Sequence, residues 1–228
     1  SLQVGCGYLF QEIKASLCDC DLLVGNLEDV LSWSCIDNEL RHCGHPEMSM
    51  ALKNIGFDIL SLANNHSFDH GESAFWETVR HCKNAGIHVS GLRSHDKYFC
   101  EPVILEKKGH RIGVLAYNWI GLERENLDWF RNNVAVIEDG VVNYSLNRNP
   151  TNNELARQHP RRKNILVFND IERLRPYVDI LIVLPHWGYE WTIYPPYGLT
   201  LEARSFIDAG ADIIIGSQPH VSQGIERY

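Results

Sequence analysis

One recurring pattern constrains the fold of this chain more than any other feature. A stretch with helical spacing leads into a short apolar run, and that run ends in a cluster of polar side chains. The clearest copy spans residues 57–63 and ends in Asn64, Asn65 and His66. Short apolar runs between helices are typical of buried strands in α/β proteins. The pattern therefore predicts an α/β fold with polar groups at the carboxyl ends of its strands, where such folds bind ligands.

The same pattern recurs along most of the chain. Helices are expected at residues 10–17, 46–55, 75–82, 169–174 and 201–206, and strands at residues 21–25, 57–63, 87–90, 180–184 and 211–215. Residues 103–105 and 112–117 are joined by a short polar turn and predict a hairpin, so we expect mixed sheets. Residues 119–163 break the pattern and predict an irregular insertion with at most one strand, at residues 134–137.

Length and composition limit the class of protein. A chain of 228 residues with 44% hydrophobic content is long enough for one substantial core, and we expect a single domain over residues 1–228. The net charge of -8 argues against a nucleic-acid partner. No run approaches the ~20 apolar residues of a membrane-spanning helix, and the first residues lack the order of a signal peptide.

The seven cysteines show no pairing pattern in the sequence. Their number is odd, and no two of them have the C-x-x-C spacing of a metal site or a redox motif. We therefore expect reduced thiols in preference to a disulfide framework.

Four residues at the predicted strand ends have the chemistry of metal ligands. They are a carboxylate, an amide and two imidazoles: Glu28, Asn65, His186 and His220. This mixture suits borderline divalent ions such as zinc, manganese or iron. Taken singly, each could equally be a loop residue that hydrogen-bonds locally, and Asn64 with Asn65 could simply form an Asx turn.

The other histidines have no comparable setting in the sequence. We interpret them as surface or packing residues: His42, His45, His70, His81, His88, His95, His110 and His159. Of these, His45 and His70 lie within a few residues of the predicted site loops.

Several motifs in this order carry a family resemblance. They are Asn26-Leu27-Glu28, Leu62-Ala63-Asn64-Asn65-His66 with Asp69 and Gly71, His186-Trp187-Gly188 with Glu190, and Gly216 through Pro219-His220-Val221. Together they resemble the capsule-synthesis CapA family, also called the poly-gamma-glutamate synthesis PgsA family. That family is similar to calcineurin-like metallophosphoesterases, so the resemblance implies a four-layer αββα sandwich of α/β (α+β) class. It also implies one or two divalent metal ions, with manganese, zinc or iron preferred.

The resemblance assigns roles to the motif residues. Glu28 would be a metal-bridging acid, Asn65, His186 and His220 metal ligands, and His66 the general acid or a substrate-orienting imidazole. Gln218 stands where the family commonly has a further histidine, and would be a weaker ligand. The remaining motif residues would contact substrate or orient ligands: Asn26, Asn64, Asp69, Glu190 and Trp187. For Trp187, core packing is an equal alternative to an aromatic wall beside the site.

The resemblance also implies a function and a setting. The expected activity is metal-dependent hydrolysis of a phosphorylated or peptide substrate, within the synthesis of a polyanionic polymer. Two alternatives stay open: a non-catalytic or polymer-binding subunit of a membrane-bound synthesis and export complex, and a metal-dependent amide hydrolase or epimerase. The family's domain opens with a Gly-Asp strand that is not seen here, so we expect a fragment truncated at both ends. Its location would be the cell envelope, through a missing anchor, or the cytoplasm.

Overall fold

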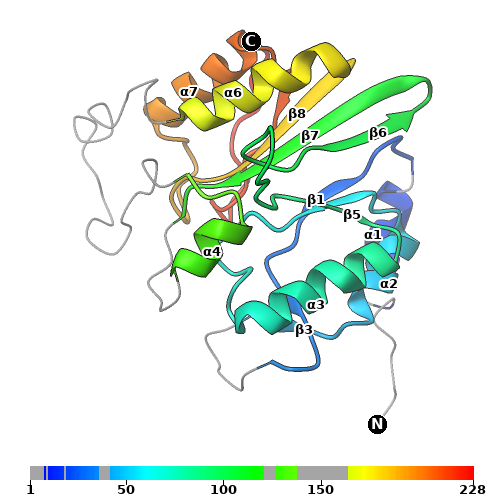
Figure 1. Ribbon diagram of the computed structural model, residues 1–228. Helices are drawn as coiled ribbons and strands as arrows, with labels where there is room; N and C mark the ends of the chain where they lie inside the picture. Colours follow the sequence, from blue (N-terminus) through cyan, green and yellow to red (C-terminus); the bar gives the residue numbers. More distant parts are fainter. Residues whose placement is uncertain (1–7, 9, 18, 36–41, 121–126, 138–163) are drawn as a thin grey trace. The chain divides into compact units, whose positions relative to one another are not determined.

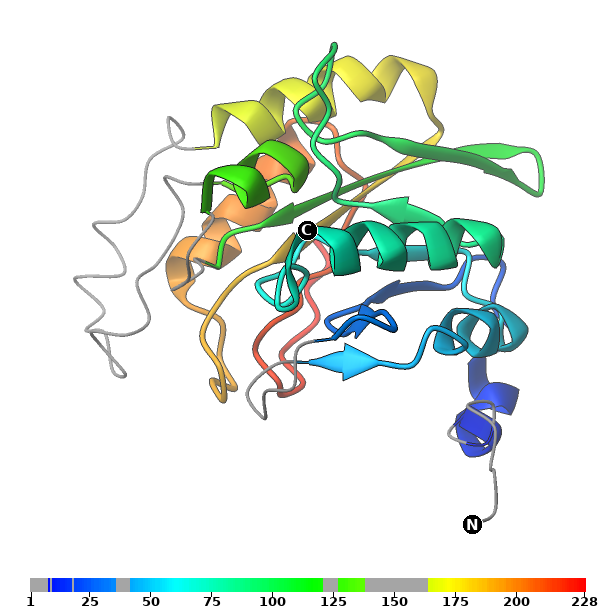
Figure 2. The same ribbon diagram turned by 60° about the horizontal axis from the view of Figure 1, so that its bottom comes forward.

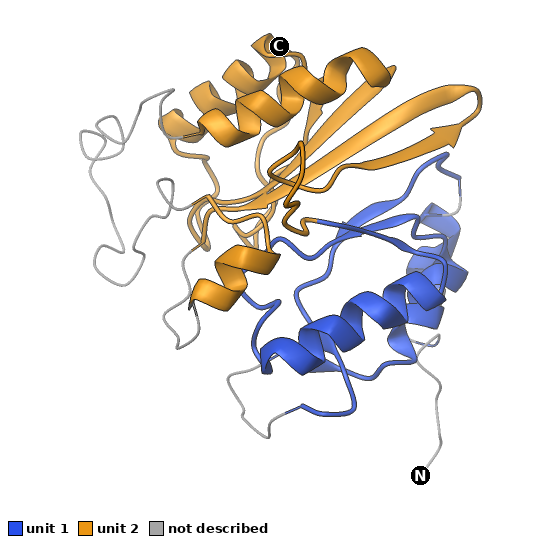
Figure 3. Ribbon diagram, in the orientation of Figure 1, with its two compact units in different colours: residues 1–90 blue, residues 91–228 orange. Residues whose placement is uncertain are grey.

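The chain forms two compact units, residues 1–90 and residues 91–228 (Figure 3). The computed structural model describes residues 8, 10–17, 19–35, 42–120, 127–137 and 164–228. Each unit combines a β-sheet with helices, so the predicted α/β class is confirmed.

Unit 1 is built around a parallel sheet with the strand order β1-β4-β5. Its strands are β1 (Val24–Asn26), β4 (Ile59–Ser61) and β5 (His88–Ser90), and its helices are α1 (Gln11–Leu17), α2 (Met48–Ile55) and α3 (Gly71–Asn84). A separate parallel pair consists of β2 (Val30–Leu31) and β3 (Cys43–Gly44). Figures 1 and 2 show α3 running beside this pair, and the Leu31 amide donates to Thr78 Oγ1 of α3 at 2.9 Å.

Local sequence explains the boundaries of the central elements in unit 1. Gly56 ends α2 with a φ of 120°, in the left-handed region that glycine adopts without steric cost. Phe75 and Val79 lie one helical turn apart on the buried face of α3. The central strand β4 is buried along its whole length, as a continuous apolar run predicts.

Unit 2 contains a mixed sheet with the strand order β6-β7-β8-β9. Its strands are β6 (Val103–Lys107), β7 (His110–Asn118), β8 (Ile180–His186) and β9 (Ile213–Ile214), and its helices are α4 (Leu127–Asn133), α6 (Ile165–Leu174), the 3-10 helix η3 (Arg175–Tyr177) and α7 (Tyr197–Asp208). The β6–β7 hairpin is antiparallel, whereas β7, β8 and β9 are parallel. The prediction of a mixed sheet is therefore confirmed.

The core of unit 2 lies between this sheet and two helices. Figure 1 shows α6 and α7 on the same face of the sheet. Buried aromatic rings fill this layer, with Trp119 and Trp187 5.2 Å apart between centroids and Phe206 of α7 stacked on Trp187 at 6.1 Å. These ring contacts hold the carboxyl end of β8 against α7.

The predicted insertion is only partly described. Residues 121–126 and 138–163 lie outside the described part of the chain. Within it, α4 is a helix that the sequence did not predict, and the predicted strand at residues 134–137 is reduced to isolated bridges at Val134 and Val136. The four-layer arrangement depends on how the two units pack together, and it stays a prediction. None of the helices in the described part of the chain combines the length and apolar character that a membrane span requires.

Candidate functional site

In unit 1, Asn64 anchors the polar turn that follows β4. Its buried amide donates to the Leu27 carbonyl at 2.8 Å and to Asn26 Oδ1 at 3.2 Å. Its Oδ1 accepts from the His66 amide at 3.1 Å and from the Ser67 hydroxyl at 3.0 Å. Asn64 thus forms an Asx turn, and its polar atoms fix the loops after β1 and β4 to each other.

The turn places His66 against a buried carboxylate. His66 Nδ1 lies 3.0 Å from Asp69 Oδ2, and Asp69 is only 2% exposed. A carboxylate acceptor at Nδ1 favours the Nδ1–H tautomer and directs Nε2 away from the carboxylate. Asp69 is therefore placed to orient the His66 ring. Glu28, just after the end of β1, accepts a hydrogen bond from Asn26 Nδ2 at 2.8 Å.

His42 and Asp29, which the sequence did not mark as site residues, also belong to this cluster. The His42 ring packs against the His66 ring with 4.2 Å between centroids, and His42 Nδ1 lies 3.3 Å from Asp29 Oδ1. The His42 amide donates to Asp69 Oδ2 at 3.0 Å. His42 is thus a surface residue that packs against His66, and its position beside the His66–Asp69 pair adds a contact that the sequence did not predict. Nothing in the local sequence indicates the contact, because 27 residues separate His42 from Asp69.

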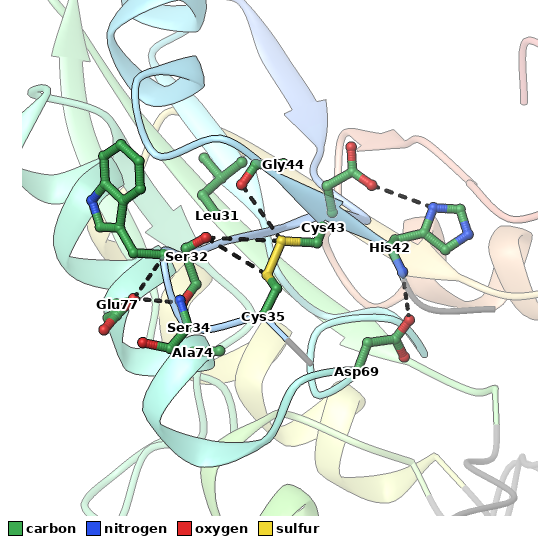
Figure 4. The surroundings of a disulfide bond; sticks show 12 residues. Leu31, Ser32, Ser34, Cys35, His42, Cys43, Gly44, Asp69, Ala74 and Glu77 are labelled. Atoms are coloured by element: carbon green, nitrogen blue, oxygen red, sulfur yellow. Dashed lines mark hydrogen bonds and ion pairs between the residues drawn. A yellow bond between two sulfur atoms is a disulfide. The ribbon is translucent and has the colours of Figure 1, made fainter. Parts of the chain in front are cut away.

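Cys35 and Cys43 form a disulfide, which corrects the expectation of reduced thiols for this pair. Their Cα atoms are 6.4 Å apart (Figure 4). The parallel pairing of β2 with β3 brings them together, and a spacing of eight residues does not reveal that pairing in the sequence. Beside the bond, the Ser32 hydroxyl donates to Glu77 at 2.5 Å and holds the pKa of Glu77 below its usual range.

His70 lies next to this disulfide. Among the described residues, Cys35, Cys43 and His70 each bring a potential ligand atom within 4.8 Å of the others. Both sulfurs are committed to the disulfide, and a thiolate is the form of cysteine that binds metals. The trio is therefore not a metal site in the oxidised chain.

In unit 2, the predicted ligands gather where β8 ends. His186 is buried at the last position of β8, and its Nδ1 lies 2.9 Å from Ser217 Oγ. The Trp187 amide donates to the Ser217 carbonyl at 3.1 Å, so the loop after β9 continues beside the end of β8. The contact between His186 Nδ1 and Ser217 Oγ fixes the imidazole ring and leaves Nε2 as the atom that would bind a metal.

Gln218 follows in the same loop and has an unusual setting. It is 6% exposed, and its Nε2 donates to Glu190 Oε1 at 3.3 Å. Its Oε1 is buried without a hydrogen-bond partner among the described residues, although buried acceptors are nearly always paired. Its φ of 98° is a conformation that residues with a side chain rarely adopt. A buried acceptor without a partner and a strained backbone are both typical of ligand-binding sites.

The remaining residues of this cluster differ in exposure. His220 is exposed and stacks on Trp191, with 5.7 Å between ring centroids. Trp187 belongs to the aromatic core, so the packing alternative describes its position. Gly216 is required there, because a Cβ at residue 216 would lie 2.8 Å from Trp187 Nε1.

The structure thus places the predicted site residues in two sets, one in each unit. Asn26, Glu28, Asn64, Asn65, His66 and Asp69 lie at the ends of β1 and β4. His186, Glu190, Gln218 and His220 lie at the ends of β8 and β9. Both sets follow parallel strands, and each set offers carboxylate, amide and imidazole donors.

Comparison with known proteins identifies the family. The model of the bacterial capsule synthesis protein PGA_cap family matches residues 2–228. The capsule biosynthesis protein CapA of Bacillus anthracis is 26% identical over 231 residues, which cover 98% of this chain and 51% of the relative. The PGA biosynthesis protein CapA of Bacillus subtilis strain 168 is 24% identical over 230 residues, covering 99% and 54%. The chain therefore spans about half the length of these curated relatives.

Solved structures are more distant in sequence. The crystal structure of a hypothetical protein from Thermus thermophilus aligns with a TM-score of 0.47 and 16% identity, over 95% of this chain and 62% of that one. The family assignment depends on the sequence match, which covers the motifs of both units. The chain belongs to the bacterial capsule synthesis PGA_cap family.

Proposed function

We propose that the chain is a divalent-metal-dependent hydrolase that acts in the synthesis of a capsule or poly-gamma-glutamate polymer. The observation that carries the catalytic part is the His66–Asp69 pair, in which a partly exposed imidazole is backed by a buried carboxylate at 3.0 Å. Such a pair is the usual arrangement of a histidine that transfers protons. The biological setting is proposed from the names of the CapA relatives.

The donor chemistry of the second set fits a metal ion. Gln218 Oε1 is a buried acceptor without a hydrogen-bond partner among the described residues, and a cation would supply its missing interaction. We propose Glu28 and Asn65 in unit 1, and His186, Gln218 and His220 in unit 2, as the residues of each unit that would hold an ion, one or two in all, with manganese, zinc or iron preferred. A bound ion of this kind polarises the scissile group and makes water a better nucleophile.

The protein's own residues then have separate tasks. Asp69 holds the His66 ring and compensates the charge that the ring gains when it is protonated. His66 gives a proton to the leaving group from Nε2. Asn64 keeps the turn rigid, so that His66 stays in one orientation.

The substrate class is proposed as an anionic, phosphorylated compound or a glutamyl polymer. The alternatives are an amide hydrolase or epimerase on the same site, and a non-catalytic subunit of a membrane-bound assembly in the cell envelope. Parallel assays with an aryl phosphate diester and with a glutamyl amide separate the first alternative from phosphoester hydrolysis.

The decisive experiment combines metal analysis with kinetics. We expect the purified protein to contain a divalent metal and to hydrolyse one of the two substrates. His66→Ala should lower kcat by about 100-fold or more with the metal retained, whereas Glu28→Ala should lower the metal content. His110→Ala, in the exposed β6–β7 turn, is the matched control. A wild-type protein that binds no metal and is inert toward both substrates would contradict the enzyme proposal and favour the non-catalytic subunit.

A further inference from the structure

The carboxylate of Asp69 is shared between two histidines. Asp69 Oδ2 lies 3.0 Å from His66 Nδ1 and also accepts the His42 amide at 3.0 Å. Two contacts on one oxygen fix the carboxylate in a single orientation. The direction in which Asp69 holds His66 therefore depends on the position of the His42 backbone.

The His42 side chain makes a second contact with the same site. Its ring packs against His66 with 4.2 Å between centroids, and Asp29 Oδ1 lies 3.3 Å from His42 Nδ1. The packing limits rotation of the His66 ring on the face that His42 covers. His42 thus contacts both members of the pair, Asp69 through its backbone and His66 through its ring.

In the described part of the chain, only short elements hold the His42 backbone in this place: its carbonyl accepts the Val30 amide of β2 at 3.3 Å. His42 precedes β3, which has two residues, and its side chain is 52% exposed. An exposed residue beside so short a strand would ordinarily sample many backbone conformations. The neighbouring Cys43, however, is bonded to Cys35 (Figure 4).

The disulfide is itself attached to α3, the helix that follows Asp69. Leu31 and Ser32, which precede Cys35, bond to Thr78 and Glu77 of α3 at 2.9 and 2.5 Å. The bond between Cys35 and Cys43 therefore connects the His42 segment to the same helix whose first residues follow the His66 turn. A covalent link of this kind removes the freedom that would let His42 leave Asp69.

We propose that His42 is a positioning residue for His66 and that the Cys35–Cys43 disulfide holds His42 in place. The catalytic consequence rests on the proposed function of His66, whereas the geometric part does not. Reduction by a dithiol transfers two electrons and two protons to the sulfurs, which become two thiols while the reductant becomes a disulfide. The covalent link is then broken, and among the described residues only the β2–β3 pairing and the bond from the Val30 amide to the His42 carbonyl hold the His42 backbone beside Asp69.

The geometric part is tested by NMR of the histidine rings in ¹⁵N-labelled protein. We expect the ring signals of His66, assigned by their loss in His66→Gln, to shift when the wild type is reduced and in the Cys35→Ser/Cys43→Ser variant. Adding the dithiol to this variant should cause no further change. Cys20→Ser, which removes an exposed free thiol, is the matched control and should leave the signals unchanged.

The catalytic part is tested by kinetics in a variant that keeps the disulfide. His42→Ala removes the ring contact and should lower kcat about tenfold with little change in KM, because outer residues that orient a catalytic group typically contribute a factor of about 10 to 100. His45→Ala, another exposed histidine three residues away, should have no effect on kcat. Adding His42→Ala to the Cys35→Ser/Cys43→Ser variant should cost less than it does in the wild type, since the two changes act through one contact.

The two proposals fail in different ways. An inert wild-type protein whose His66 signals still respond to reduction would contradict only the hydrolase proposal. Unchanged His66 signals both after reduction, confirmed by a thiol count, and in His42→Ala would overturn the positioning role. Because His42→Ala retains the disulfide, the test remains decisive even where the cysteine variant does not fold.

Discussion

At the residue scale, Gln218 has the most unusual local environment in the candidate site. Its φ of 98° and its buried Oε1 are both unfavourable for an isolated glutamine, since the conformation is strained and the acceptor is desolvated. Glu190 holds only the nitrogen end of its amide. Coordination of a metal ion by Oε1 would offset the cost of the strained backbone and of the desolvated acceptor.

This explanation predicts the effect of a stronger donor. Gln218→His replaces an amide oxygen with an imidazole, which binds zinc better than a neutral carbonyl does. We expect the affinity for Zn²⁺ to rise by about tenfold, as measured by competition with a chromophoric chelator. Gln223→His, in which the exchanged glutamine donates to the Thr192 carbonyl, is the control. Equal affinities in wild type and Gln218→His would exclude residue 218 from the metal site.

A second prediction at this scale concerns Glu202 in α7. Burial raises the pKa of Glu202 from 4.5 to about 7. Between these values the folded chain keeps a proton that the unfolded chain has lost, so stability falls as the pH rises through this window. Glu202→Gln should therefore be more stable than the wild type at pH 8, by about 1 to 2 kcal/mol once partial exposure is allowed for.

Chemical denaturation at pH 4.5 and pH 8 measures this difference. The variant and the wild type should have similar free energies of unfolding at pH 4.5, where the glutamate is protonated in the folded chain. A difference that does not grow with pH would show that the Glu202 carboxyl titrates normally.

At the scale of elements, one buried carboxylate joins α6 to the sheet of unit 2. Asp170 of α6 accepts the amides of Phe99 and Cys100 at 2.8 Å each and the Tyr117 hydroxyl at 2.9 Å. Burial raises the pKa of Asp170, and the three donors counteract this effect. The helix is thereby fixed both to β7 and to the segment before β6 by one side chain.

The network predicts a graded loss of stability. Asp170→Ala leaves two buried amides and one hydroxyl without an acceptor and should lower the free energy of unfolding by about 3 to 5 kcal/mol. Tyr117→Phe removes a single hydrogen bond and should cost about 1 kcal/mol. Guanidinium denaturation compares the two variants. Similar losses in both would mean that Asp170 contributes no more than its bond to Tyr117.

At the scale of the whole molecule, metal binding should couple to stability. A ligand that binds only the folded chain stabilises it by about 2.7 kcal/mol at a free concentration 100 times Kd. We expect a chelator to lower the Tm of the wild type, and Glu28→Gln in unit 1 and His186→Gln in unit 2 each to reduce this effect. Calorimetry with and without chelator measures it. If the chelator does not change the Tm, a contribution of bound metal to the stability of the folded chain is excluded.

The sequence predicted the parts of the fold that depend on local pattern. Buried strands such as β4 and β8 are continuous apolar runs, and Gly56 marks the end of α2. Local pattern was less informative for α4, which lies in the irregular segment, and for the two-residue strands β2 and β3. Elements this short have too few residues to show a period.

The sequence by itself determined the α/β class, the positions of the main strands along the chain and the polar residues that follow them, because each depends only on neighbouring residues. Only the tertiary structure decided which side chains meet. The contacts of His42 with Asp69 and His66 join residues more than 20 positions apart, and the Cys35–Cys43 bond joins the segment after β2 to β3, both strands of only two residues. Such pairs depend on how β3 and the turn after β4 are placed in space, and no local period or motif encodes that placement.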